Sequence, residues 1–437
     1  MSLAVTGAVR GGERVGLRAE NGLITEVGPE VQPHPGDDVL DAAGGILIEP
    51  LINGHTHAAM TLFRGYGDDL PLMRWLEEKI WPVERKLKPD DVYWGTRLAC
   101  LEMIRSGTVR FWDMYWHAPA AASAVADAGL RATVAAPLID VDGRSEEMRQ
   151  AALGSLDEIV DAGERVDAGL APHAIYTVTE ASLRWIAELA AERGFPVQIH
   201  LSETEQEVID CVAAHGERPA HYLDRVGLLS PRTVLPHGVW LNDDELELIA
   251  ERGAVVVTNP VANLKLAVGA VFPYGRARAA GVQVGLGTDG PGSNNSLDLF
   301  ADMKVLALIQ KHAADDPAAI GAAETWEIAT GRRAPLLGAA PGLHPGQPAD
   351  FLLLRAAAPE LSFGELPAAL VYAASGAVVH STVVAGRVLM RNGEIEGAEE
   401  VLAHALERAR GLGLAPPIPP ARPANPPNPL RPGTTTS

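Results

Sequence analysis

Short runs of apolar residues alternate with longer stretches of helical period between about residue 45 and residue 345. The helical stretches include residues 180–193 and 243–252, in which apolar side chains recur on one face. The apolar runs are strand candidates at residues 46–52, 108–112, 132–139, 166–171, 197–201, 233–235, 254–258 and 282–287. Such alternation is typical of an α/β protein with a parallel sheet. Eight units predict a closed (β/α)8 TIM barrel, which we favour over a doubly wound sheet because no GxGxxG turn follows the first strand.

Both ends of the chain lack this helical period and instead predict short β-strands. These segments are residues 15–18, 23–27, 349–354, 377–384 and 388–391. Strands at both ends of a barrel predict that the two ends meet in one small β-sandwich. We therefore expect residues 1–50 and 346–414 to form the two parts of the sandwich, 51–345 the barrel and 415–437 a proline-rich tail.

Charge and composition restrict the partners and the compartment. The 437 residues contain 36 Lys and Arg against 56 Asp and Glu, a formal net charge of −20. This charge repels phosphate backbones, so we expect a small-molecule substrate and no nucleic acid. The sequence contains no run of about 18 apolar residues, so we expect no membrane-spanning segment. The two cysteines are typical of a protein in a reducing, cytoplasmic compartment. A homo-oligomer is compatible with the sequence.

Composition alone does not explain the thirteen histidines of the chain. His55 and His57 follow an apolar strand candidate, and residues two apart in an extended segment face the same side. Other strand candidates end close to further residues that can bind a metal or transfer a proton, namely His200 with Glu203, His237 and Asp289. The carboxyl ends of barrel strands converge on one face, so we expect these residues to form one site.

A set of histidines and a carboxylate without thiolate suits Zn²⁺ and tolerates Fe²⁺ or Mn²⁺. Such a metal with an open coordination position lowers the pKa of a bound water to about 7. Glu203 follows His200 by three residues, so it could shuttle protons at this site. No lysine occurs between Lys88 and Lys265, so no strand in that interval can supply a carboxylated lysine to bridge two metals. We therefore expect one divalent metal ion.

With these residues, the chain resembles the amidohydrolase superfamily. It is similar to the cytosine-deaminase-like branch, which contains triazine hydrolases and methylthioadenosine/S-adenosylhomocysteine deaminases. The resemblance runs from about residue 5 to 390 and rests on motifs at residues 50–57, 60–65, 171–176, 198–203, 259–266 and 287–295.

The resemblance implies a role for each site residue. The implied metal ligands are His55, His57, His200 and Asp289. Glu203 is then the proton shuttle, and His237 hydrogen-bonds the incoming hydroxyl or the substrate. In the nucleoside deaminases of this branch, residues matching Trp75, Glu84 and His173 contact the base and the ribose.

The chain also departs from the pattern of the S-adenosylhomocysteine deaminases. Those enzymes hold the amino-acid carboxylate with arginines after the third strand, where this chain has Ala136, and only Arg144 or Arg149 could serve as the second arginine. Ala262 replaces the serine of the motif at residues 259–266. Without a bidentate clamp, adenosine and 5′-methylthioadenosine are as well supported as the homocysteinyl compound.

The site residues together with this resemblance predict a metal-dependent deaminase of an adenosine-type nucleoside that releases ammonia. Glu203 and Asp289 would accept the proton of the attacking water, Glu203 would protonate the ring nitrogen, and His237 would stabilise the developing alkoxide. One alternative is another heterocycle on the same site: a triazine, a guanine-like base or a pterin. A second alternative is a non-catalytic scaffold of the same fold, against which the retained site residues argue.

Overall fold

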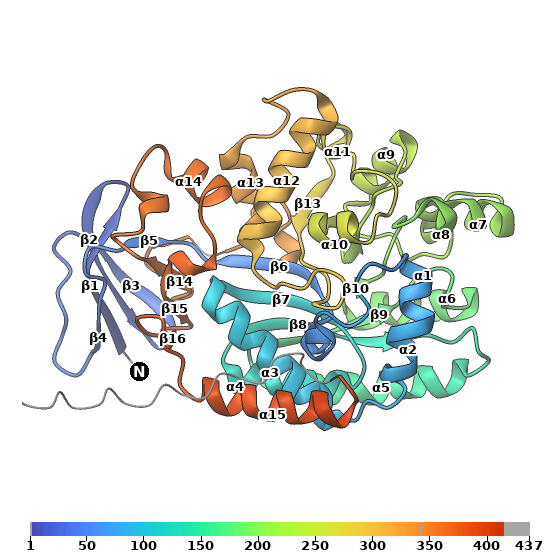
Figure 1. Ribbon diagram of the computed structural model, residues 1–437, viewed down its shortest axis with the longest axis horizontal. Coiled ribbons are helices and arrows are strands. Elements are labelled where there is room, and N and C mark those ends of the chain that lie inside the picture. Colours follow the sequence, from blue (N-terminus) through green and yellow to red (C-terminus); the bar gives the residue numbers. More distant parts are fainter. Residues whose placement is uncertain (1, 341, 415–437) are drawn as a thin grey trace, which may run out of the picture.

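The computed structural model describes residues 2–340 and 342–414, and a parallel eight-stranded sheet lies at its centre (Figure 1). Its strands follow one another in chain order: β6 (Leu51–Thr56), β7 (Thr108–Met114), β8 (Arg131–Leu138), β9 (Val166–Pro172), β10 (Val197–Gln198), β11 (Thr233–Pro236), β12 (Val255–Thr258) and β13 (Gln283–Leu286). All neighbouring strands are parallel, so every connection crosses over and returns to the same edge. The α/β class with a parallel sheet is therefore as predicted.

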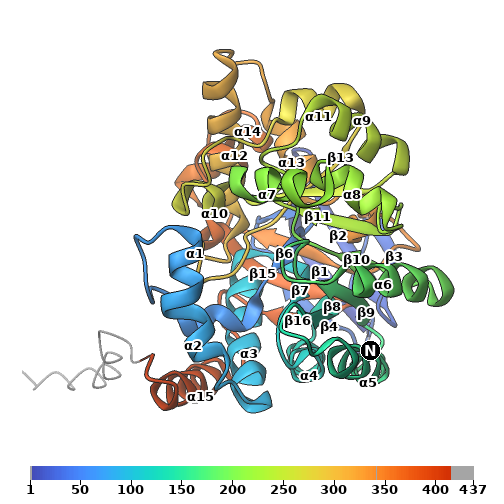
Figure 2. The same cartoon turned by 90° about the vertical axis from the view of Figure 1, so that its right-hand side faces the viewer.

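Helices fill these connections and surround the sheet (Figure 2). They are α3 (Pro89–Ser106), α4 (Ala118–Ala128), α5 (Ser145–Asp161), α6 (Glu180–Arg193), α7 (Glu205–His215), α8 (Pro219–Arg225), α9 (Asp243–Arg252), α10 (Pro260–Lys265), α11 (Tyr274–Ala280), α12 (Leu299–Ala314) and α13 (Ala322–Ala329). The connection after β6 holds four short elements before α3: η1 (Ala58–Phe63), α1 (Leu72–Trp75), η2 (Leu76–Ile80) and α2 (Trp81–Glu84). No helix among the described residues is long and apolar enough to cross a membrane.

The helices predicted over residues 180–193 and 243–252 are confirmed as α6 and α9, and local chemistry sets their ends. The Thr179 hydroxyl accepts from a backbone N–H of the first turn of α6, and Asn242 and Glu245 form a capping box on α9. Gly194 and Gly253 end the two helices with positive φ angles of 77° and 71°, which glycine adopts without steric cost.

Hydrogen bonds join β6, the first strand of the central sheet, to the segment that follows β13, the last strand. The Asp289 N–H donates to the His55 carbonyl over 3.1 Å, and the Asn53 amide donates to the Thr288 hydroxyl over 2.7 Å. Gly287 permits this approach, because a Cβ there would lie 3.0 Å from the His55 Cβ. Among the described residues, the strand pairing of the sheet runs from β6 to β13. The hydrogen bonds of His55 and Asn53 therefore connect the two edge strands of this order.

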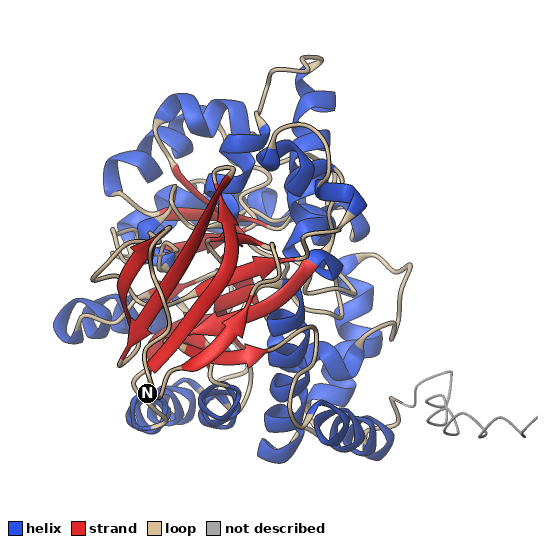
Figure 3. Cartoon of the chain, turned by 90° about the vertical axis from the view of Figure 1, so that its left-hand side faces the viewer, coloured by secondary structure: helices blue, strands red, loops and turns tan. Residues whose placement is uncertain are grey.

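A second sheet combines both ends of the chain (Figure 3). Its strands are β1 (Ser2–Arg10), β2 (Glu13–Glu20), β3 (Leu23–Gly28), β4 (Asp38–Asp41), β5 (Ile46–Ile48), β14 (Phe351–Leu354), β15 (Val379–Val384) and β16 (Arg387–Met390). The order is β16-β15-β14-β5-β1-β2-β3, with β4 pairing to β1. Antiparallel pairing of β5 with β14 joins the N-terminal strands to the C-terminal ones, so the two ends meet in one sheet.

Two predictions about these elements need correction. The strand predicted over residues 46–52 is broken at Glu49 and Pro50, because proline has no backbone N–H for a sheet ladder. The segment at 346–414 also contains helices that were not predicted: η4 (Pro359–Leu361), α14 (Leu366–Tyr372), η5 (Gly376–Val378) and α15 (Ala398–Gly411). Helix α15 packs on α3 (Figure 1). The predicted proline-rich tail lies outside the described residues.

Candidate active site

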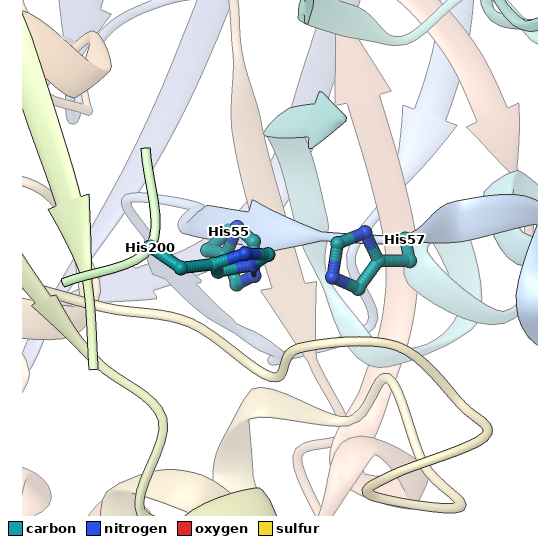
Figure 4. Close-up of side chains that lie close together, drawn as sticks. All are labelled: His55, His57 and His200. Carbon is teal, nitrogen blue, oxygen red and sulfur yellow. Dashed lines mark hydrogen bonds between the residues drawn. The ribbon is translucent and has the colours of Figure 1, made fainter. Parts of the chain in front are cut away.

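The carboxyl edge of the central sheet gathers histidines and an aspartate from four strands. His55 is in β6 and His57 follows it, His200 lies two residues beyond β10, His237 follows β11, and Asp289 lies three residues beyond β13. All except His57 are at most 5% exposed. The close-up in Figure 4 shows His55, His57 and His200 side by side. The predicted convergence is therefore what the structure shows.

The ring nitrogens and the carboxylate surround a common centre. His55 Nε2 lies 3.2 Å from His200 Nε2 and 3.3 Å from Asp289 Oδ1, and His57 Nε2 lies 3.2 Å from the same Oδ1. Two groups of donor atoms lie within 4.8 Å of one another: His55, His57 and His200, and His55, His237 and Asp289. These distances place the potential ligand atoms around one site.

Outer hydrogen bonds orient two of these imidazoles toward the centre. His57 Nδ1 donates to the Met114 carbonyl over 2.6 Å, and His55 Nδ1 lies 3.2 Å from Gln198 Oε1. The Gln198 amide nitrogen in turn donates to a backbone carbonyl, which fixes its oxygen toward His55. Both Nε2 atoms therefore face Asp289, and this arrangement is typical of metal-binding histidines.

The electrostatics of the cluster favour a cation at its centre. Burial opposes a charge on His57, but the hydrogen bond and charge of Asp289 outweigh it and raise the pKa of His57 to about 9. Burial lowers the pKa of His55 to about 4. Burial also disfavours the charged form of Asp289, yet the two histidines hold the pKa of this carboxyl well below its usual range. A divalent ion would replace the proton on His57, so the donor set fits a metal ion.

Glu203 and His237 lie next to each other beside this centre. Glu203 Oε2 lies 3.8 Å from His237 Nε2, and both side chains are buried. Burial raises the pKa of Glu203 above its usual value, which suits a group that must both accept and return a proton. His237 Nδ1 lies 2.8 Å from Asn263 Oδ1, an acceptor that directs the Nε2 atom toward Glu203.

The structure brings three of the four predicted substrate-binding residues to this cavity. Trp75, Glu84 and His173 line it together with His57, His200, Glu203, His237 and Asp289. The Tyr115 hydroxyl donates to Glu84 over 2.8 Å and the Trp116 indole over 3.3 Å, so the carboxylate is held at the cavity wall. His173 Nδ1 pairs with Thr177 at 2.9 Å, and burial lowers its pKa to about 3.

Arg144, the fourth predicted substrate contact, lies elsewhere. Its side chain is half exposed, pairs with Asp142 at 2.7 Å and Glu147 at 3.7 Å, and lines an adjoining groove of ≈ 1030 Å³. The alternative residue, Arg149, donates to Ser182 at 2.9 Å. Neither arginine is among the described residues that line the cavity containing His57, Glu203 and Asp289. Ala136 is buried in β8, and Ala262 is buried in α10.

Three residues that were not predicted support the site from behind: Gln198, Asn263 and Asp113. Gln198 and Asn263 lie within motifs that carried the family resemblance, but nothing in their spacing showed that they contact His55 and His237. Asp113 lies near the carboxyl end of β7, where it accepts from the Thr56 hydroxyl at 2.8 Å and the Ala58 N–H at 2.6 Å. Its place at a strand end was the available signal.

A cluster of histidines with an aspartate at the carboxyl edge of a parallel α/β sheet is typical of metal-dependent hydrolytic enzymes. Residues 48–389 match the amidohydrolase family. The chain belongs to this family, which confirms the resemblance carried by its motifs.

Two named relatives give more specific comparisons than the family does. The chain is 47% identical over 397 residues to a 5′-deoxyadenosine deaminase of Methanoregula boonei, covering 89% of this chain and 90% of the relative. It is 42% identical over 392 residues to a 5-methylthioadenosine/S-adenosylhomocysteine deaminase of Archaeoglobus fulgidus, covering 88% and 92%.

Solved structures agree with the fold. A zinc-bound adenosine deaminase from Xanthomonas campestris has a TM-score of 0.86 and 33% identity, over 94% of this chain and 98% of that one. A triazine hydrolase has a TM-score of 0.85 over 93% and 99% of the two chains, but at 21% identity this likeness concerns the fold alone.

Proposed function

We propose that the protein is a metal-dependent hydrolytic deaminase of adenosine-type nucleosides. The observation that carries this proposal is the convergence of His55, His57, His200 and Asp289 with the buried Glu203 on one cavity. The names of the relatives, which are 5′-deoxyadenosine and methylthioadenosine/S-adenosylhomocysteine deaminases, give the substrate class. The reaction replaces the amino group of the purine ring by oxygen from water and releases ammonia.

His55, His57, His200 and Asp289 would hold the metal ion, which we propose to be zinc, with iron or manganese as alternatives. A bound divalent ion lowers the pKa of water to about 7 and so supplies a nucleophile at neutral pH. Zinc is bound in the similar adenosine deaminase structure, and a site of imidazoles and one carboxylate suits it.

Glu203 moves the protons of the reaction. One carboxylate oxygen accepts a proton from the attacking water and returns it to the ring nitrogen next to the carbon under attack, which makes that carbon more electrophilic. Asp289 accepts the remaining proton of the added hydroxyl and passes it to the amino group, which leaves as ammonia when its bond to the ring carbon breaks. His237 Nε2 is the hydrogen-bonding partner of the oxygen that develops on the ring. Burial of these groups strengthens each interaction by excluding water.

Glu84, Trp75 and His173 bind the nucleoside in this proposal. The Glu84 carboxylate still has lone pairs for the ribose hydroxyls beside the Tyr115 and Trp116 bonds. The apolar surface of Trp75 contacts the base, and His173 Nε2 faces the cavity as a hydrogen-bonding group. Arg144 is engaged with Asp142 and Glu147, which favours substrates with an uncharged 5′ group over S-adenosylhomocysteine.

We also propose finer points of organisation. The hydrogen bond between Asp289 and His55 supports a sheet closed into a barrel over residues 51–345. The branching of the terminal sheet at β1, which pairs with β2, β4 and β5, supports a sandwich of residues 1–50 with 346–414. The free, buried Cys100 and Cys211 support a cytoplasmic enzyme, and the charge of −20 supports a small-molecule substrate.

Substitution of Glu203 tests the proposal. The zinc-loaded wild type should release ammonia from adenosine, 5′-deoxyadenosine or 5′-methylthioadenosine with the absorbance change of a hypoxanthine product. Glu203→Gln should retain its metal and lose at least about 100-fold in kcat, because its amide cannot transfer the proton. Full activity of this variant would contradict the role of Glu203, and an inactive wild type would contradict the substrate class.

A further inference from the structure

Glu207 is a buried carboxylate beside the catalytic turn, and the reaction described above leaves it without a role. It belongs to the first turn of α7 and is 6% exposed. Its two oxygens accept hydrogen bonds from consecutive backbone amides: Ser202 N–H donates to Oε1 over 2.8 Å and Glu203 N–H donates to Oε2 over 2.9 Å. Both amides belong to the turn that carries Glu203.

This turn has a backbone conformation that needs support. Ser202 has a φ of 49°, in the left-handed region that residues other than glycine rarely adopt. The Ser202 carbonyl accepts from the Trp240 N–H over 2.9 Å, which holds one side of the turn to the segment after β11. Glu207 holds the other side, and without it two buried N–H groups would lose their partners.

Glu207 is itself anchored firmly enough to position its neighbour. Its backbone N–H donates to the hydroxyl of Thr204, the N-cap of α7, over 3.2 Å. Glu203 lies two residues before α7 and Glu207 lies in its first turn, so the carboxylate reaches back over only four residues. Among the described residues, Glu207 does not line the catalytic cavity, so it would act through Glu203.

We propose that Glu207 is a positioning residue for proton transfer: its carboxylate fixes the Ser202–Glu203 turn and thereby directs the Glu203 side chain into the cavity. The proposal rests on the proposed function, in which Glu203 transfers the proton. Such positioning affects the rate strongly, because a misplacement of about 1 Å can cost about 100-fold in rate.

The first test compares Glu207→Gln with Glu205→Gln, an exposed glutamate on the same helix. The side-chain amide that replaces the Glu207 carboxylate offers one acceptor oxygen to two N–H donors, so kcat for adenosine should fall about 10- to 100-fold with KM within about 3-fold. Glu205→Gln should match the wild type. Both variants should retain their metal and be assayed well below their melting temperatures.

A double-mutant cycle separates positioning from general stability. In a Glu203→Gln background, adding Glu207→Gln should cost less than about 3-fold in residual activity, because the group that it positions has already lost its function. A loss as large as in the wild-type background would overturn the proposal, as would an unchanged kcat of the single Glu207→Gln variant.

Amide hydrogen exchange gives a readout that does not depend on activity. In Glu207→Gln at least one of the Ser202 and Glu203 amides should exchange about 10-fold faster or more than in the wild type, whereas Glu205→Gln should leave both unchanged. If the wild type released no ammonia from any adenosine, the proposed function would fail, and this exchange would still test whether Glu207 holds the turn. Unchanged exchange in Glu207→Gln would overturn the inference.

Discussion

Asp113 is expected to brace the segment that carries His57, and its substitution tests this role quantitatively. One oxygen of the buried carboxylate accepts from the Ala58 N–H at 2.6 Å and from the Thr56 hydroxyl at 2.8 Å. These two donors belong to the residues on either side of His57 in the chain. In Asp113→Ala the segment would lose both bonds from β7.

The expected cost follows from these partners. The buried Ala58 N–H would lose its acceptor, at about 1–3 kcal/mol. The Thr56 hydroxyl also donates to the Trp112 carbonyl over 2.9 Å and keeps that partner. Removing the other carboxylate oxygen, which has no hydrogen-bond partner among the described residues, offsets part of the loss. We expect Asp113→Ala to destabilise the metal-free protein by about 1–3 kcal/mol and to weaken metal binding about 10- to 100-fold.

Urea unfolding followed by tryptophan fluorescence measures the first effect, and competition with a chelator measures the second. The unfolding is done without metal, because bound metal adds its own binding free energy to the apparent stability. Asp113→Asn is the matched control: it keeps the accepting oxygen and should stay within about 1 kcal/mol of the wild type. If Asp113→Ala matched the wild type in both midpoint and metal affinity, the carboxylate would not brace His57.

Three further predictions address binding, pH and packing. Glu84→Gln should lower kcat/KM for adenosine about 10- to 100-fold through weaker ribose hydrogen bonds, while 2′,3′-dideoxyadenosine should react equally with both proteins; an equal loss for both nucleosides would contradict the ribose contact. Burial raises the pKa of Asp302 to about 8, so the folded state binds the extra proton between about pH 4 and 8 and stability falls as pH rises through this range. Urea unfolding at pH 5 and pH 8 measures how much the free energy of unfolding falls between the two pH values. This fall should be smaller in Asp302→Asn than in the wild type by more than about 2 kcal/mol, and an equal fall in both proteins would assign it to other groups. In Gly287→Ala the new Cβ would lie 2.9 Å from Val257 Cγ1 and 3.0 Å from the His55 Cβ, so elemental analysis should find metal retention reduced, and a fully loaded variant would contradict the tight packing.

The catalytic cluster was predictable because two simple periodicities determine it. Side chains two apart in an extended segment share a face, and parallel strands present their carboxyl ends at one edge, so His55, His57, His200, His237 and Asp289 had to converge once the strands were recognised. The helices with clear apolar faces and caps, α6 and α9, were predictable for the same local reasons.

Features that depend on tertiary contacts were not predictable from local pattern. Helix α15 has a narrow buried face of Val401, Ala405 and Ala409, which gives a weak apolar period. The apolar residues at 46–48 and 51–52 predict one strand, but the break at Glu49 and Pro50 sends the two halves to different sheets. Arg144 follows β8 closely in sequence, but its acidic neighbours hold it outside the catalytic cavity.

Incubation of the zinc-loaded wild type with 5′-deoxyadenosine in water labelled with heavy oxygen tests the central proposal most directly. The account predicts that each nucleoside consumed yields one ammonia and one 5′-deoxyinosine carrying one heavy oxygen on its base, as measured by mass spectrometry. Recovery of unchanged nucleoside across a panel of adenosines, or release of free adenine in place of a deaminated nucleoside, would contradict it.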